Sequence, residues 1–297
     1  MTDTETGRIP RIYRQGTIKP DTVETTPVVV GGRRYRFEYC RGSAGGDPCF
    51  RFVDAETGAP LPSFARDHHL GSAFADGDTV YAAGVDKEWG GDTLRFFASR
   101  DLVRWEQTAE FALPGWKLFN TGVCRYKGGY LLLLEISEPA EEAGVPFTFR
   151  FAVSPDMKNW TLTPRECVFQ KDRYAGGPAV YNVGDGFVYV LYLEALAGPR
   201  YETGIARSKD LIHWEYSPEN PVMSPCPEDK RMAGPLLSPA DCRRIREAEN
   251  INNRDLELCE YKGKTVIYYS WGNQQGNEFL AEARFDGGLK EFLQGWF

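Results

Sequence analysis

The sequence predicts an all-β fold, a five-bladed β-propeller, from three observations. A short turn motif recurs at a fixed spacing, apolar strands come in pairs joined by glycine-containing turns, and about five such units fill the chain. The composition, 42% hydrophobic with 31 Gly and 19 Pro, is typical of a packed protein with many turns. We therefore expect one domain that spans residues 1–297.

The turn motif reads Ser-x-Asp-x-x-x-Trp and occupies residues 99–105, 154–160 and 208–214. Each copy follows a strand-like run, so it should lie on a turn between neighbouring strands. The Asp is expected to accept hydrogen bonds from free backbone N–H groups, and the Trp to pack against the next sheet. Because the same carboxylate recurs in every copy, we interpret it as structural rather than catalytic. Degenerate copies lie near Asp54 and Asp286.

Five pairs of apolar strands, each joined by a turn that contains glycine, are expected to form hairpins. The pairs are residues 26–30 with 35–39, 71–75 with 79–85, 122–126 with 130–135, 178–183 with 187–194, and 256–261 with 265–271. Units of about four strands repeated around an axis make a propeller.

Two further segments complete the predicted fold. The last unit ends at Phe297 with little chain left for a fourth strand, so an N-terminal strand within residues 11–17 is expected to supply it and close the ring. Residues 238–249 begin with Ser238 and Pro239, which suit the N-cap and the first position of a helix. We therefore expect one short helical insertion between blades four and five.

Charge and composition exclude several classes of protein. A net charge of −7 argues against partners such as nucleic acid or an anionic membrane surface. The first ten residues contain no apolar run, so we expect no signal peptide and a cytoplasmic protein, although a secreted protein whose signal has been removed would look the same. Seven cysteines without a CxxC pair indicate free thiols rather than a zinc site or a disulfide framework.

The candidate site is the funnel formed by the starting ends of the innermost strands, because ligands bind at such concave mouths. Counting back eight residues from each hairpin glycine gives Glu24, His69, Asn120, a small residue at Gly176 or Pro178, and Asp255. The residue differs in each unit, so structural repetition does not explain the set.

The second strands return to the same rim. There the sequence places Arg41, Glu135, Glu194 and Trp271, each of which lies either at a solvated edge or in a functional cavity. The polar stretches 251–257 and 270–278 add Asn253, Asn273 and Gln275, although turn formation is an equal explanation for the two Asn residues.

Acids, amides, a histidine and an aromatic ring around one hole suit a sugar. Glycoside hydrolysis needs a proton donor and a base or nucleophile, and crowded carboxylates have their pKa values pushed apart. We expect Glu24 and Asp255 to be the acid and base, with Glu135, Glu194 or His69 able to replace or tune either. Trp271 would stack on the sugar, and the hydroxyls would be held by Arg41, Asn120, Asn253, Asn273 and Gln275.

No cofactor is expected. His68 and His69 leave a central metal ion open as an alternative, but adjacent residues on a strand point to opposite faces.

The repeated turn motif, followed by polar blade starts, resembles that of the five-bladed propeller glycoside hydrolases of families 43, 32, 117 and 130 over nearly the whole chain. This resemblance implies a hydrolase that trims the end of an oligosaccharide or small glycoside. The acidic triad of family 43 lies at the starts of blades one, three and four, where this chain has Glu24, Asn120 and Gly176. Only the first is acidic, so that mechanism cannot be carried over. Family 117 is similar in using a suspected histidine acid, which draws attention to His69.

Two other functions stay open at this point. One is a carbohydrate-binding propeller without catalysis. The other is a glycoside phosphorylase or lyase. Phosphorolysis needs a basic cluster at the funnel, and only Arg41 and Arg254 are candidates for it.

Overall fold

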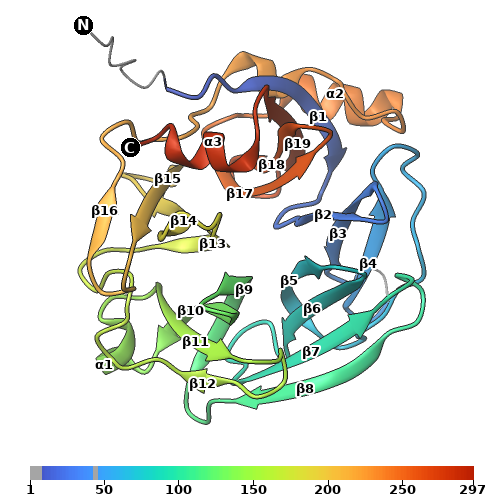
Figure 1. Ribbon diagram of the computed structural model, residues 1–297. Coiled ribbons are helices and arrows are strands. Elements are labelled where there is room, and N and C mark those ends of the chain that lie inside the picture. Colours follow the sequence, from blue (N-terminus) through green and yellow to red (C-terminus); the bar gives the residue numbers. More distant parts are fainter. Residues whose placement is uncertain (1–8, 43–45) are drawn as a thin grey trace, which may run out of the picture.

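Five antiparallel sheets stand around a central axis in the computed structural model, which describes residues 9–42 and 46–297 (Figure 1). Blade one has three strands, β2 (Pro27–Val30), β3 (Arg33–Cys40) and β4 (Cys49–Asp54). Blade two contains β5 (His69–Asp76), β6 (Thr79–Val85), β7 (Thr93–Ser99) and β8 (Glu106–Ala112). The predicted five-bladed propeller is confirmed.

The remaining blades have four strands each. Blade three contains β9 (Lys117–Tyr126), β10 (Gly129–Glu138), β11 (Thr148–Ser154) and β12 (Thr161–Leu162). Blade four contains β13 (Gly176–Tyr181), β14 (Val188–Ala195), β15 (Tyr201–Ser208) and β16 (Trp214–Tyr216). Blade five contains β17 (Asn252–Tyr261), β18 (Lys264–Gly272) and β19 (Glu278–Phe285), and its fourth strand is β1 (Tyr13–Pro20).

The predicted closure by an N-terminal strand is confirmed. Strand β1 pairs with β19 from Tyr13 opposite Arg284 to Pro20 opposite Phe279, slightly later in the chain than residues 11–17. The last blade is thus built from both ends of the described chain, as the blue and red strands in Figure 1 show.

The turn motifs have the predicted structural role. Asp101 accepts hydrogen bonds from the backbone N–H groups of Val103 and Arg104, at 2.9 and 2.8 Å. Asp156 and Asp210 make the same pair of bonds in their own turns. The Trp of each motif packs against a neighbouring blade as expected, but it is the preceding one rather than the next: Trp105 stacks on Phe64, Trp160 on Phe96 and Trp214 on Phe151.

The predicted helical insertion is α2 (Pro239–Glu247), between β16 and β17. Ser238 caps it, since its hydroxyl accepts from the Asp241 N–H at 3.1 Å. The short helices α1 (Ala140–Ala143), α3 (Leu289–Gln294) and a 3-10 turn (Pro227–Lys230) were not predicted.

The expected cytoplasmic location stays a prediction. No helix of the described ranges is long and apolar enough to cross a membrane. The expectation of no export signal falls largely on residues 1–8, which lie outside the described residues. All seven cysteines are free thiols.

Candidate active site

The backbone at the start of the innermost strands is irregular in a repeated way. A β-bulge interrupts the inner strand of blades two, four and five near its start, and the bulged residues Leu70, Gly177 and Asp255 have φ of 47°, 51° and 54°. Glu24 of blade one has the same left-handed backbone, with φ of 52°. Such strain in residues other than glycine concentrates at functional sites, and bulges redirect side chains.

This register corrects one prediction. In blade two the residue equivalent to Asp255 is Leu70, and His69 instead corresponds to Arg254, since each is the last paired residue before its bulge. Gly77 is the first residue of its hairpin turn and Gly263 the second, so a count of eight residues from each glycine assigned His69 to the wrong register.

Four carboxylates converge on the axis: Glu24, Glu135, Asp255 and Glu257. The Asn120 Nδ2 donates to Glu24 Oε1 at 3.3 Å and to Glu135 Oε2 at 3.0 Å. These two oxygens therefore lie at most about 6 Å apart, a separation at which two buried carboxylates rarely ionise together. The structure thus brings together Glu24, Asn120, Glu135 and Asp255, which the sequence had placed at one funnel.

The two glycines at the start of blade four make room for these acids. A Cβ on Gly176 would lie 2.9 Å from Glu135 Oε1, and one on Gly177 would lie 2.5 Å from Asp255 Oδ1. The Gly177 N–H also donates to Glu135 Oε2 at 3.3 Å. The carboxyl groups of Glu135 and Asp255 therefore flank Gly177 within about 8 Å of each other, a distance compatible with acid and base roles. The start of blade four has glycine where an acidic residue could stand. The carboxylates of Glu135 from blade three and Asp255 from blade five lie against these glycines instead.

Burial sets the protonation of these groups. Burial and the charge of Glu24 raise the pKa of Glu135 to about 8, although the Asn120 and Gly177 donors oppose the shift. Burial also raises the pKa of Glu24, and the neighbouring Asp255 adds to that rise. The pKa of Asp255 is raised by burial too, but the Arg254 guanidinium 3.2 Å away favours its charged form.

Glu257 was not selected from the sequence. It lies two residues beyond Asp255 on β17 and accepts hydrogen bonds from Thr26 at 3.3 Å and Tyr181 at 3.4 Å. Burial raises its pKa to about 8. The period-2 alternation of a strand could have identified it, because residues two apart share a face.

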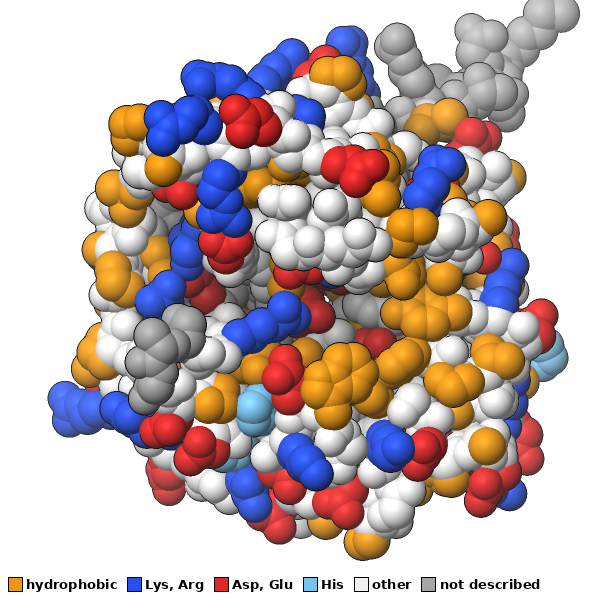
Figure 2. Space-filling model, turned by 180° about the vertical axis from the view of Figure 1, so that it is seen from behind, with side chains coloured by type: hydrophobic (Ala, Val, Ile, Leu, Met, Phe, Trp, Pro, Cys, Tyr) orange, Lys and Arg blue, Asp and Glu red, His pale blue; other side chains and the backbone are white. Residues whose placement is uncertain are grey.

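The space among these side chains is small. Glu24, Asn120, Gly177, Asp255 and Glu257 line a cavity of about 10 Å³, which has room for about one water molecule. Figure 2 shows a wider hollow at the centre of one face of the propeller, where acidic and basic side chains surround the opening and hydrophobic ones gather along one side. A ligand much larger than a water molecule does not fit among these carboxylates.

Arg41 stands at the mouth of the funnel. Its guanidinium contacts Glu24 at 3.4 Å and Glu278 at 3.6 Å, and Glu88 lies 3.9 Å away. Arg254, which is 4% exposed, also pairs with Glu278. Both arginines are the candidates for a basic cluster at the funnel, and each forms ion pairs with carboxylates.

His69 also lies near this mouth. Its Nδ1 is 2.8 Å from the Tyr39 hydroxyl, and burial lowers the pKa of the ring. His68 faces other neighbours, since its Nδ1 bonds the Arg66 carbonyl at 2.7 Å. Within the described ranges, no three His, Cys, Asp or Glu side chains form a cluster suited to a metal ion.

Two predicted ligand contacts are wrong in this structure. Trp271 is completely buried, stacks on Phe279 and donates from Nε1 to Thr17, so neither face of its ring is free for a sugar. Asn253 is also fully buried and bonds Arg14 at 2.9 Å and Asp229 at 3.2 Å, away from the axis.

Three other candidates lie apart from the four carboxylates. Glu194 is one-third exposed and pairs with Arg173 at 3.4 Å. Asn273 uses its Oδ1 to accept the Gln275 N–H at 2.9 Å, which is the turn-forming alternative. The Gln275 side chain is exposed. Among the described residues, no hydrogen bond or ion pair links these three to Glu135 or Asp255.

An aromatic arc, not anticipated from the sequence, borders the mouth. Trp89 is 69% exposed and packs edge-on against Phe119, which precedes Asn120. Phe119 contacts Phe147 at 4.6 Å, and Phe147 contacts Tyr174 at 5.5 Å between ring centres. An exposed indole beside the funnel offers the stacking face that Trp271 does not.

Comparison with known proteins supports the fold. No protein-family model matches the sequence, and a search of curated proteins gives no match. Among solved structures, an α-L-arabinofuranosidase from Fusarium graminearum in complex with an iminosugar inhibitor is 13% identical, with 92% of this chain and 97% of that chain covered and a TM-score of 0.62.

Two other solved structures show the same likeness. A xylan β-1,4-xylosidase from Bacillus halodurans is 14% identical over 92% of this chain and 54% of its own, with a TM-score of 0.61. A family-32 β-fructofuranosidase from Bombyx mori is 12% identical over 93% and 61%, with a TM-score of 0.55. At these identities the likeness shows the fold, which is the five-bladed propeller of glycoside hydrolase families 43 and 32.

Proposed function

We propose that the protein is a glycoside hydrolase that cleaves a terminal sugar at the mouth of the axial funnel. The observation that carries this proposal is the meeting of Glu135, Asp255 and Glu24 around Gly177 and Asn120. Acids with differing environments in one pocket are the basis of acid/base hydrolysis of glycosides.

Glu135 is the proposed proton donor. With a pKa of about 8 it keeps its proton at neutral pH, as a general acid must. Glu24 acts on it as a positioning residue, because its charge raises the pKa of Glu135 and Asn120 links the two carboxyl groups. On bond cleavage the proton of Glu135 passes to the leaving glycosidic oxygen.

Asp255 is the proposed base. The buried Arg254 beside it favours the ionised carboxylate, and the water-sized cavity that Asp255 lines would hold the attacking water. Asp255 would take a proton from this water as it attacks the anomeric carbon. This arrangement favours inversion at the anomeric carbon, because the water attacks opposite the leaving group. Trp89 would stack on the sugar and Arg41 would bind its hydroxyls.

The test is a panel of chromogenic pyranosides and furanosides assayed with the wild-type protein, Glu135→Gln and Asp255→Asn. Glu110→Gln is the matched control, since Glu110 is half exposed on blade two and pairs with Arg95. We expect one class of glycoside to be cleaved, with losses of about 10²–10⁴-fold in the two site variants and none in the control.

Two results would contradict the proposal. One is near-wild-type turnover by both site variants. The other is saturable binding of the same sugars without release of product, which would leave a carbohydrate-binding propeller. Proton NMR of the first-formed product gives its anomeric configuration. Retention of the substrate's configuration would mean that Asp255 does not activate a water molecule for direct attack on the anomeric carbon.

A further inference from the structure

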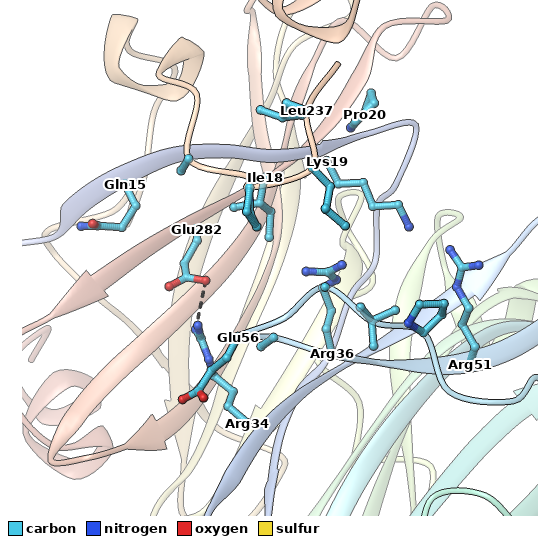
Figure 3. A pocket seen from close by; sticks show the side chains of 17 residues that line it. Gln15, Ile18, Lys19, Pro20, Arg34, Arg36, Arg51, Glu56, Leu237 and Glu282 are labelled. Atoms are coloured by element: carbon cyan, nitrogen blue, oxygen red, sulfur yellow. Dashed lines mark ion pairs between the residues drawn. The ribbon is translucent and has the colours of Figure 1, made fainter. Parts of the chain in front are cut away.

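A second hollow lies away from the axis, on the seam between blades one and five (Figure 3). Strand β1 forms one wall and β3 and β4 form another, and the cavity measures about 670 Å³. That volume is in the range of small-molecule sites. We call it the seam pocket; its charged lining comprises Lys19, Arg34, Arg36, Arg51, Glu56 and Glu282. It shares no lining residue with the axial cavity.

Three cations of the seam pocket share one carboxylate. Lys19, Arg36 and Arg51 contact Glu38 at 2.5, 2.7 and 2.9 Å. Glu38 is 1% exposed, and against the effect of burial Arg36 and Lys19 lower its pKa to about 2. It is therefore ionised, and it neutralises one of three positive charges.

The two remaining acids of the lining have partners of their own. Glu282 pairs with Arg34 at 3.0 Å, drawn as a dashed line in Figure 3. Glu56 accepts from the Tyr261 hydroxyl at 3.0 Å and lies 3.5 Å from Lys262. Around Glu38 two positive charges are left in excess.

Arg36 is aimed into this hollow. It is 9% exposed, and only its Nε is hydrogen bonded, to Glu38, among the residues that the structure describes. In Figure 3 its two terminal nitrogens point into the pocket toward Lys19. The Nε of Arg36 is satisfied by Glu38, and its terminal N–H groups are left to match an oxyanion.

Closure of the ring accounts for only part of this cluster. Two ion pairs join blade five to blade one there, Arg34 with Glu282 and Lys19 with Glu38. Arg36 on β3 and Arg51 on β4 belong to the same blade as Glu38, so their charges are not needed to join the blades. Burial lowers the pKa of Lys19, and the nearby Arg51 and Arg36 add to that lowering. A second anion in the pocket would relieve this repulsion.

Apart from Gln15, the uncharged side chains of the pocket wall are apolar. Ile18, Val53, Pro60 and Leu236 line it, and Leu236 is 72% exposed. A free inorganic ion would use only the cationic end. A ligand that fills the pocket therefore has an anionic group at Arg36 and an uncharged body against these side chains.

We propose that the seam pocket binds a small organic oxyanion, a phosphate or carboxylate group carried on a compact apolar or ring-shaped body. Arg36 holds the anion with its terminal N–H groups, and Lys19 and Arg51 flank it. This proposal does not rest on the hydrolase activity, because the site is separate from the axial acids and is tested by binding alone.

The test measures binding of phenyl phosphate, benzoate and inorganic phosphate by calorimetry, with benzyl alcohol as the neutral probe. Variants are Arg36→Gln and Arg51→Gln; the latter leaves Glu38 with two cations and is the safer for folding. Arg125→Gln is the matched control, because Arg125 pairs with Asp76 on another blade. We expect saturable binding of phenyl phosphate or benzoate, weakened roughly tenfold or more in both pocket variants and unchanged in the control.

Whichever of phenyl phosphate and benzoate binds more tightly shows whether the pocket prefers a phosphate or a carboxylate group. The proposal is overturned if no anion binds at millimolar concentration, if Arg51→Gln binds as the wild type does, or if benzyl alcohol binds as tightly as the anions. None of these outcomes changes the expected turnover of glycosides.

Discussion

Replacing Glu135 with glutamine should change how the stability of the protein depends on pH. Glu135 is 4% exposed, and its pKa is raised from the usual 4.5 to about 8. Between those values the folded protein holds a proton that the unfolded chain has lost, so stability falls as pH rises. The slope from one such group is about 1.4 kcal/mol per pH unit.

The magnitude follows from this slope. Between pH 5 and pH 8 the wild-type protein should lose about 4 kcal/mol of unfolding free energy through Glu135 alone. Glu135→Gln keeps the size of the side chain and an oxygen for the Gly177 N–H, but it has no proton to lose. The variant should therefore gain about 4 kcal/mol on the wild type across this range.

Urea unfolding at pH 5, 6, 7 and 8 measures the effect, with Glu110→Gln as the control that should follow the wild-type curve. Parallel stability curves for the wild type and Glu135→Gln would refute the raised pKa and with it the assignment of Glu135 as a neutral acid. Because the readout is stability, it does not depend on knowing the substrate.

Three other outcomes are expected. Glu257→Gln should remove a second slope of about 1.4 kcal/mol per pH unit in the same urea titration, because burial raises the pKa of Glu257 to about 8; an unchanged slope would mean that it ionises normally. Glu24→Gln should move the alkaline limb of the kcat/KM profile to lower pH, since the charge of Glu24 raises the pKa of Glu135; no movement would contradict the coupling. Asp229→Ala should cost about 3–5 kcal/mol of unfolding free energy by urea, because it leaves the ion-paired Arg14 without its buried partner; a cost below 1 kcal/mol would show that water replaces the carboxylate.

The fold could be predicted because its determinants are local and repeated. The Asp and Trp of each motif act within a turn and on the adjoining blade, so identical side chains recur at identical places. The N-terminal strand could be predicted from the missing fourth strand of the last blade. A propeller can be recognised from its sequence because each blade needs the same contacts, so the same motif recurs at a fixed spacing.

The site could be predicted only in part, because side-chain direction depends on the bulges. Before the bulge in β17, Asn253 turns toward Asp229, whereas Asp255 in the bulge and Glu257 after it line the axis. An extra residue reverses the alternation of side chains, which a count from the hairpin glycine cannot detect. Trp271 was misplaced for a related reason, since a strand end shows no sign in sequence of whether its side chain faces the funnel or the core.

The most direct measurement of the central claim is the dependence of kcat/KM on the leaving group in Glu135→Gln. A proton donor matters for a sugar leaving group and hardly for dinitrophenolate, which leaves without protonation. We expect the variant to lose about 10²–10⁴-fold on a disaccharide or alkyl glycoside and much less on the dinitrophenyl glycoside of the same sugar. Equal losses on both substrates would contradict the assignment of Glu135 as the acid of a glycoside hydrolase.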